Sequence, residues 1–240
     1  MASNEDNKNS GITVFSESCL NCIVKSCAVA ELNRAQLELL NSNVARMQFE
    51  RGDKLFKEKA FNAHVIYIRA GLVKIHTQVG QGRDFILRLV KAPAYLGLAT
   101  IFGDNVNQYS ATALTPIEAC CININTFKYL LRDNGSFASE IIADICRNEL
   151  LDFKRYTSLS NKPLTSLVAG VLLYFSEMIF QSDQFDLLLT RTEIAELIGT
   201  SREGVTRMIS SFKEEGLIEV RRSRISILQP AALKAVAEAG

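Results

Sequence analysis

The chain has 240 residues, and a composition that is 48% hydrophobic and 22% charged is that of an ordinary globular protein. No stretch approaches the ~18 consecutive apolar residues that span a bilayer. The N-terminus is polar, unlike a secretory signal, so we expect a cytoplasmic protein with no membrane partner. The net charge of +1 does not indicate nucleic-acid binding, which must therefore be argued from local pattern.

The first 28 residues form a cysteine-rich segment without hydrophobic periodicity. Five of the six cysteines are grouped along the chain, namely Cys19, Cys22, Cys27, Cys120 and Cys121. Thiols at C-x2-C spacing commonly share a metal or a redox event, and a reducing cytoplasm disfavours structural disulfides. A polar N-terminal extension has little core to fill. The N-terminal cysteines are therefore candidates for chemistry rather than packing.

Residues 29–133 are predicted to form a sensor domain with a small antiparallel barrel or roll. After a short helix over 29–40, alternating runs predict strands at 65–69, 72–76, 85–90 and 119–124, separated by glycine-containing turns. Neighbouring strand residues point to opposite faces, so one of Cys120 and Cys121 is expected in the core. By the same alternation with Ile75, we expect His76 to face solvent.

Residues 134–160 are predicted to form one long helix, capped by Ser136 and ending near Leu159. Its broad apolar face needs a partner, either the roll or its twin in a dimer. Cys146 lies on that face and is expected in the core. Glu149 and Asp152 are expected to oppose association if they meet their twins, which would make the dimer switchable.

Residues 161–240 carry the clearest local pattern. Pro163 suits the first turn of a helix that ends near Ile179. Two capping-box patterns, Thr190–Glu193 and Thr200–Glu203, open short helices around the turn residue Gly199. Strands over 217–220 and 225–228 then form a two-stranded wing. Together these elements predict a winged helix-turn-helix.

Residues Thr190 to Ile209 closely resemble the DNA-reading motif of the CRP/FNR superfamily of bacterial transcription regulators. The resemblance covers nearly the whole chain, including Glu50–Asp53 and Ala70-Gly71 in the roll. It implies an α+β fold with an N-terminal cyclic-nucleotide-binding-like antiparallel β-roll, a long dimerisation helix and a C-terminal winged helix-turn-helix. It also implies a homodimer that is not an enzyme, with double-stranded DNA and RNA polymerase as partners.

The resemblance assigns residues to the DNA interface by their place in the motif. Arg202, Glu203 and Arg207 match base-contacting positions, and their side chains suit guanine and cytosine edges. Thr206 lies on the same helix face. Residues matching phosphate contacts are Arg191 and Ser201. The expected operator is two-fold symmetric, with TGA-containing half-sites.

The residues that grip cyclic AMP in some family members are missing. The matching positions are Ala94-Tyr95 and Tyr109-Ser110, which lack the sugar-binding Glu and the phosphate-binding Arg. A buried phosphate without a counter-charge is very costly. Cyclic AMP is therefore not expected as the effector.

Similarity to the FNR branch implies that Cys19, Cys22, Cys27 and Cys120 ligate a 4Fe-4S iron–sulfur cluster that senses oxygen, nitric oxide or redox state. The spacing from Cys22 to Cys27 is one residue shorter than is usual in that branch. Structural zinc and a thiol–disulfide switch stay open as alternatives. Two further alternatives involve other residues: haem on His64 or His76, and an uncharged or aromatic effector near Tyr95 and Tyr109.

Overall fold

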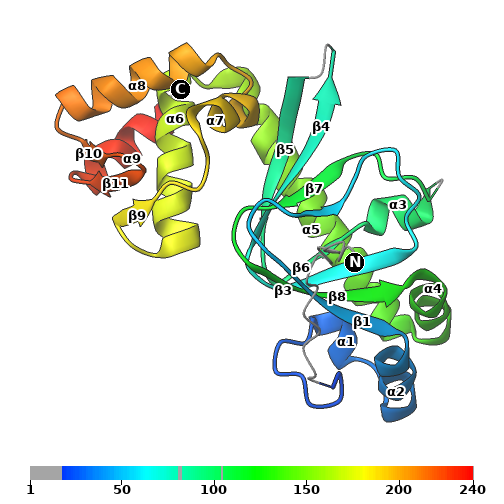
Figure 1. Ribbon diagram of the computed structural model, residues 1–240. Coiled ribbons are helices and arrows are strands. Elements are labelled where there is room, and N and C mark those ends of the chain that lie inside the picture. Colours follow the sequence, from blue (N-terminus) through cyan, green and yellow to red (C-terminus); the bar gives the residue numbers. More distant parts are fainter. Residues whose placement is uncertain (1–17, 81–82, 104, 240) are drawn as a thin grey trace, which may run out of the picture.

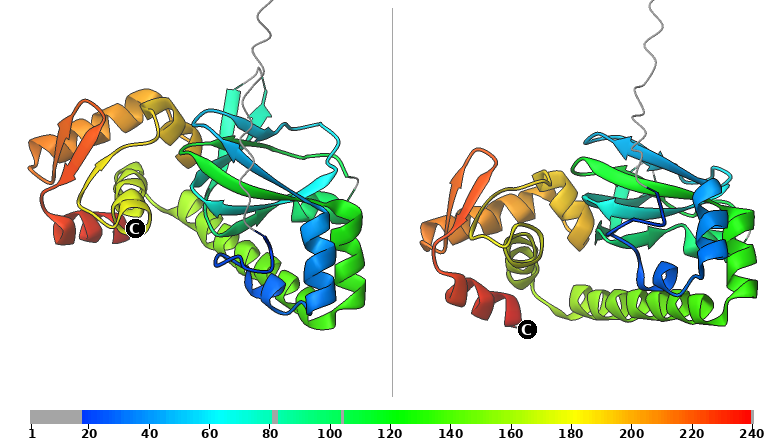
Figure 2. Two further views of the ribbon diagram at one scale, coloured as in Figure 1. Left: turned by 60° about the horizontal axis from the view of Figure 1, so that its bottom comes forward. Right: turned by 90° about the horizontal axis from the view of Figure 1, so that it is seen from below.

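The computed structural model describes residues 18–80, 83–103 and 105–239, and it confirms the predicted α+β architecture. One long helix, α5, runs along the β-roll, and the helix-turn-helix half lies beyond the C-terminal end of this helix (Figure 1). The α5 helix spans Gly135–Asn161 and passes along the roll before the chain enters the C-terminal half (Figure 2).

The roll consists of two four-stranded sheets with strand orders β1-β8-β3-β6 and β2-β7-β4-β5, and the strand pairs within them are antiparallel. Its strands are β1 (Val44–Phe49), β2 (Lys54–Phe56), β3 (His64–Ala70), β4 (Leu72–Val79), β5 (Arg83–Lys91), β6 (Ala94–Leu96), β7 (Ser110–Ala113) and β8 (Ile117–Asn123). Aliphatic side chains such as Ile68, Val73 and Ile75 fill the space between the sheets. The interior of the roll is therefore filled by hydrophobic side chains.

The prediction that His76 faces solvent is wrong. Its side chain is buried, and its Nε2 lies 2.9 Å from Thr112 Oγ1. The pairing of β4 with β5 shifts register between Ile75 and His76, which indicates a β-bulge or similar irregularity. Because the alternation breaks there, two consecutive side chains are both buried.

Short helices cover one end of the roll. They are α1 (Cys27–Ala30), α2 (Arg34–Ser42), α3 (Leu98–Phe102) and α4 (Ile124–Asp133). The single helix predicted over 29–40 is divided because Asn33 forms a capping box with Gln36, which starts α2 afresh.

The α5 helix is capped by Asn134 rather than by Ser136, since the Asn134 side chain accepts a hydrogen bond from the Phe137 amide at 2.9 Å. Only Phe137 and Ile141 of this helix are buried. Its exposed large apolar side chains are Ile142, Ile145, Leu150, Leu151, Phe153 and Tyr156. Cys146 is exposed as well, contrary to prediction, because most of α5 has no cover within the subunit.

The C-terminal half is built around α6 (Leu164–Leu173), which continues into a π-helical segment, η1 (Tyr174–Phe180). The remaining elements are β9 (Gln184–Asp186), α7 (Arg191–Ile198), α8 (Arg202–Glu214), β10 (Ile218–Arg221), β11 (Arg224–Ile227) and α9 (Pro230–Glu238). The wing has strand order β10-β11-β9, so β9 adds a third strand that the sequence did not predict. In the described part of the chain, no helix is long and apolar enough to cross a membrane.

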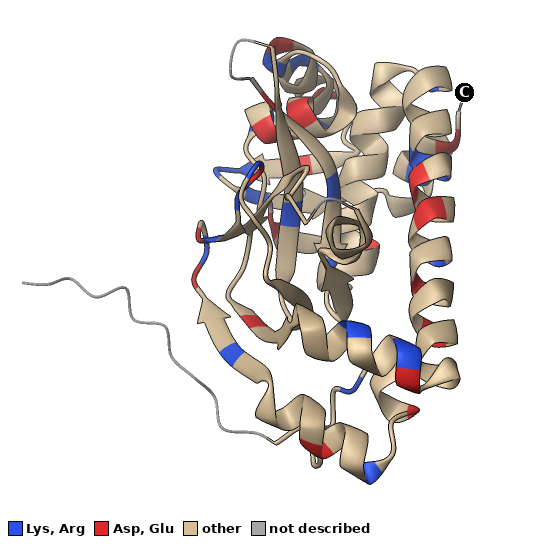
Figure 3. Ribbon diagram, turned by 90° about the vertical axis from the view of Figure 1, so that its right-hand side faces the viewer, with Lys and Arg blue, Asp and Glu red and all other residues tan. Residues whose placement is uncertain are grey.

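Charged residues of both signs are interleaved on the side of the molecule drawn in Figure 3. This distribution agrees with the net charge of +1 and shows no single-sign face in that view.

Candidate functional site

Three of the four predicted cysteine ligands line one small cavity between the N-terminal segment and the roll. Cys19 and Cys22 enter it from the segment before α1, and Cys120 enters it from β8. Cys27 is exposed at the first position of α1 and does not line the cavity. Cys121 points to the other face of β8 and is buried in the roll core. The structure thus brings Cys19 and Cys22 to Cys120 and separates them from Cys121, while Cys27 lies outside the cavity.

Specific hydrogen bonds hold the cysteine segment against the roll. Asn41 Oδ1 accepts from the Cys19 amide at 3.0 Å and from Arg46 Nη2 at 2.6 Å. The same Arg46 nitrogen lies 3.3 Å from Cys19 Sγ. Ser26 caps α1 and its Oγ lies 2.7 Å from Tyr95 Oη. The segment is therefore anchored on both sides of Cys22.

Burial and nearby charge shape the chemistry of these thiols. Burial, together with the charge of neighbouring Cys19, raises the pKa of Cys120 to about 11, although Arg69 and Arg46 act in the opposite direction. Burial also raises the pKa of Tyr67 to about 12. The Tyr67 hydroxyl is buried without a hydrogen-bond partner among the described residues. The cavity is therefore lined by thiols, by Arg69 and by the Tyr67 hydroxyl, which has no hydrogen-bond partner among the described residues.

The donor set consists of thiols, which ligate iron–sulfur clusters as well as structural zinc. Among the described residues, no three His, Cys, Asp or Glu side chains are grouped tightly enough to hold one metal ion. A 4Fe-4S cluster takes one thiolate at each iron, so its ligand sulfurs stand further apart than those around one zinc ion. The cavity of about 30 Å³ is close to the size of a water, so the cysteine segment must move outward to admit a cluster.

The cysteine segment is connected to α5 by contacts made through α1. Cys27 begins α1, and Val29 of α1 packs in the same core cluster as Phe137 and Ile141 of α5. The side-chain amide of Asn134 donates to Glu31 O at 3.0 Å. A change in the cysteine segment therefore has a short physical route to the long helix.

The positions expected for an organic effector are filled by side chains. The Tyr95 ring is buried against Tyr67, with ring centroids 4.8 Å apart, and against Phe127 at 6.0 Å. Tyr109 packs on Phe56 at 5.5 Å. The rings of Tyr95 and Tyr109 thus both pack against other aromatic rings of the protein.

The helix-turn-helix forms largely as its sequence predicts. Thr190 and Glu193 make the predicted capping box at the start of α7, and Gly199 ends that helix with a left-handed φ of 70°. The second predicted box is wrong by one residue. Ser201, not Thr200, caps α8, and its Oγ accepts from the Gly204 amide at 3.0 Å.

One face of α8 is exposed and carries the predicted base-reading residues. Val205, Ile209 and Phe212 are buried beneath it. The exposed members of the predicted interface are Ser201, Arg202, Glu203, Thr206 and Arg207. In the described chain, the side chains of Arg202, Glu203 and Arg207 make no hydrogen bond or ion pair, so all of them can reach a ligand.

Arg191 differs from the other predicted DNA contacts. It is half-buried at the start of α7, and one guanidinium nitrogen, Nη1, is buried without a partner among the described residues. Burial lowers the pKa of Arg191.

An ion pair between Lys74 in β4 and Glu193 in α7 was not predicted from the sequence. Lys74 Nζ lies 2.6 Å from Glu193 Oε1.

Comparisons with known proteins agree with this architecture. The sequence matches the cyclic nucleotide-binding domain family over residues 46–134 and the Crp-like helix-turn-helix domain family over residues 168–236. It is 26% identical to the electron transport regulator A of Shewanella oneidensis, over 93% of this chain and 92% of that protein. It is 25% identical to the fumarate and nitrate reduction regulatory protein of Vibrio cholerae, over 91% and 90%. A solved CRP/FNR-family structure from Eubacterium rectale shares the fold with a TM-score of 0.77 at 20% identity, covering 88% of this chain and 97% of that one.

Proposed function

Because the chain belongs to the CRP/FNR family of transcription regulators, which bind DNA as dimers and are not enzymes, we propose that it is an FNR-like homodimeric sensor. Its signal would be oxygen, nitric oxide or redox state, read through a 4Fe-4S cluster on Cys19, Cys22, Cys27 and Cys120. The observation that carries this proposal is the convergence of cysteines from two distant segments on one cavity.

When bound, such a cluster supplies an oxidant-sensitive group held by four thiolates. The chain's own residues do the rest. Arg46 and Arg69 lie near the thiols and favour their anionic form. Ligation would draw Cys27, and with it α1, toward the roll. Because α1 packs on α5, this movement would bias the long helix toward pairing of its exposed apolar face with a second copy.

The exposed face of α8 supports sequence-specific reading of DNA. Arg202, Glu203, Thr206 and Arg207 would contact base edges in the major groove, with Ser201 and Arg191 near phosphates. The operator would be two-fold symmetric with TGA-containing half-sites, and RNA polymerase would be the further partner. Cyclic AMP would not be the effector, since the corresponding part of the roll carries the packed tyrosines Tyr95 and Tyr109.

The proposal is tested by anaerobic purification followed by visible absorption and iron and sulfide analysis, before and after exposure to air. We expect about four irons per chain and a brown chromophore that air bleaches. A colourless protein without iron, even after reconstitution, would contradict the cluster. Zinc bound in place of iron would contradict it equally.

Single cysteine variants sharpen this test. Cys120→Ser should lose iron, whereas Cys121→Ala and Cys146→Ser should keep it, because Cys121 faces the roll core and Cys146 lies on α5. Cys27→Ser should also lose iron, although Cys27 does not line the cavity. Full iron in Cys120→Ser would show that the wrong strand residue had been assigned.

A further inference from the structure

One arginine near the end of α5 contacts the roll and the helix-turn-helix at the same time. Arg155 Nη2 donates to Ile86 O of β5 at 3.0 Å and to Leu197 O of α7 at 2.5 Å. Because Arg155 itself belongs to α5, a single guanidinium joins the sensor roll, the long helix and the first helix of the DNA-reading motif.

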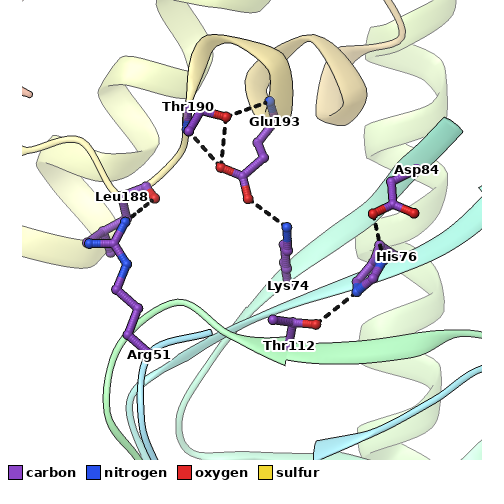
Figure 4. Close-up of polar contacts among 8 residues, drawn as sticks. All are labelled: Arg51, Lys74, His76, Asp84, Thr112, Leu188, Thr190 and Glu193. Atoms are coloured by element: carbon purple, nitrogen blue, oxygen red, sulfur yellow. Dashed lines mark hydrogen bonds and ion pairs between the residues drawn. The ribbon is translucent and has the colours of Figure 1, made fainter. Parts of the chain in front are cut away.

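The other end of α7 is held by a second basic side chain. Lys74 of β4 pairs with Glu193 at 2.6 Å, and the two side chains are only 13% and 20% exposed. The other carboxylate oxygen of Glu193 closes the capping box with Thr190, so the ion pair is continuous with the start of the helix (Figure 4). The α7 helix is thus fixed at its N-terminal turn by Lys74 and at its C-terminal turn by Arg155.

These polar contacts lie between close packing on one side and open space on the other. Ile86 of β5 shares a buried hydrophobic cluster with Leu197 and Ile198 of α7. A cavity of about 670 Å³ separates β5 and the second half of α5 from α6. It is lined by Arg155 and Leu197 together with apolar residues such as Leu151, Leu167 and Val171. Apolar packing of Ile86 against α7 joins the halves beside this cavity. The hydrogen bonds of Arg155 add directed contacts at the cavity edge.

The chemistry of the Arg155 contact suits a directional role. Leu197 O lies in the last turn of α7, where carbonyl groups lack helical partners and carry partial negative charge. The nearby carboxylate of Asp152 is instead 3.3 Å from Arg88. Among the described residues Arg155 therefore forms no ion pair, and its hydrogen bonds go to the backbone carbonyls of Ile86 and Leu197, whose positions are set by the fold.

We propose that Arg155 is a positioning residue for DNA recognition, which fixes the orientation of α7 and α8 relative to α5. In a dimer joined along α5, this orientation sets the separation of the two α8 helices, and hence the spacing of half-sites that the dimer accepts. The proposal stands on the DNA-binding function and does not depend on which signal the cysteines sense.

The test measures spacing discrimination with full-length protein. An operator is first selected from random duplexes with the wild type. Affinities are then measured for that operator, for versions with one or two base pairs added or removed between half-sites, and for a single half-site. Arg155→Met should bind the preferred spacing about tenfold more weakly and lose about tenfold of its discrimination between spacings, as expected for lost charge-assisted hydrogen bonds. Its base preference within a half-site should be unchanged.

Lys154→Met is the matched control, because it removes the same charge from an exposed neighbour on α5 that makes no hydrogen bond or ion pair in the described chain. It should keep wild-type spacing discrimination. Lys74→Met, which releases the other end of α7, provides a second variant should Arg155→Met not fold, and it should also lose discrimination. Unchanged discrimination in Arg155→Met, or in Lys74→Met where it replaces that variant, would overturn the proposal. An equal loss of affinity at every spacing would do so too. Iron content measured on the same samples keeps this result separate from the cluster hypothesis.

Discussion

Replacing Tyr67 by Phe should stabilise the iron-free protein, although the residue is buried in the core. Its hydroxyl is shielded from solvent and has no hydrogen-bond partner among the described residues. A buried polar group without a partner costs about 1–3 kcal/mol. Removing the oxygen leaves the ring packing on Tyr95 in place, so we expect the free energy of unfolding to rise by about 1 kcal/mol.

Tyr95→Phe is the matched comparison, and this variant should lower the free energy of unfolding. The two rings pack at a tilt of 45° in the same cluster, but Tyr95 Oη lies 2.7 Å from Ser26 Oγ. Loss of one neutral hydrogen bond costs about 1 kcal/mol. Ser26 still accepts from the Val29 amide, which limits the penalty. The two variants should therefore differ by about 2 kcal/mol, roughly 30-fold in the unfolding equilibrium.

Urea denaturation of reduced, iron-free protein at pH 7 provides the measurement. Burial raises the pKa of both tyrosines, to about 12 for Tyr67, so both are neutral and charge does not contribute. Protein concentration must be held constant, because association along α5 would add to apparent stability. A Tyr67→Phe protein that loses as much stability as Tyr95→Phe would refute the reasoning. It would mean that the Tyr67 hydroxyl has a partner.

Three further predictions concern the DNA-reading helix and the roll. Arg207→Ala should lose about 1–3 kcal/mol of discrimination between bases at one operator position. The melting temperature of the protein should not change, because the Arg207 side chain is exposed. Competition binding against single-base operator variants measures the discrimination. Ser201→Ala should lower unfolding free energy by about 1 kcal/mol, because the cap of the Gly204 amide is lost, and Ser201→Thr should restore most of it in urea titrations. Burial lowers the pKa of His76 in the folded protein below its usual 6.5. As the pH falls, the unfolded chain therefore binds a proton at His76 before the folded chain does. The free energy of unfolding should consequently decrease below about pH 6.5. His76→Gln should flatten that dependence in denaturation curves recorded between pH 8 and 5, and an unchanged slope would exclude His76 as its source.

Local patterns in the sequence predicted most elements because their causes are local. The alternation over 119–124 placed a strand that the structure has at Ile117–Asn123, and it separated Cys120 from Cys121 onto opposite faces. The Thr190 capping box formed as written. Where two hydroxyl residues stand side by side, at Thr200 and Ser201, the pattern could not select the cap, because both can accept the same kind of hydrogen bond.

The failures come from interactions between distant segments. His76 is buried because its strand changes register against a neighbour, which no periodicity within β4 reveals. Lys74 and Glu193 are 119 residues apart in sequence, so their pairing has no local signature. The cysteine site was likewise predicted through family resemblance rather than from spacing, since only the fold brings Cys120 to the N-terminal segment.

The length of α5 places its two functional contacts on one side of the helix. Phe137 packs with the cysteine-bearing α1, and Arg155, 18 positions further along the chain, contacts α7. At about 3.6 residues per turn this is roughly five complete turns, so both side chains leave the helix on the same side, about 27 Å apart. A rotation of α5 about its own axis would therefore move both contacts in the same direction, which would link the position of the cysteine segment to that of the DNA-binding half.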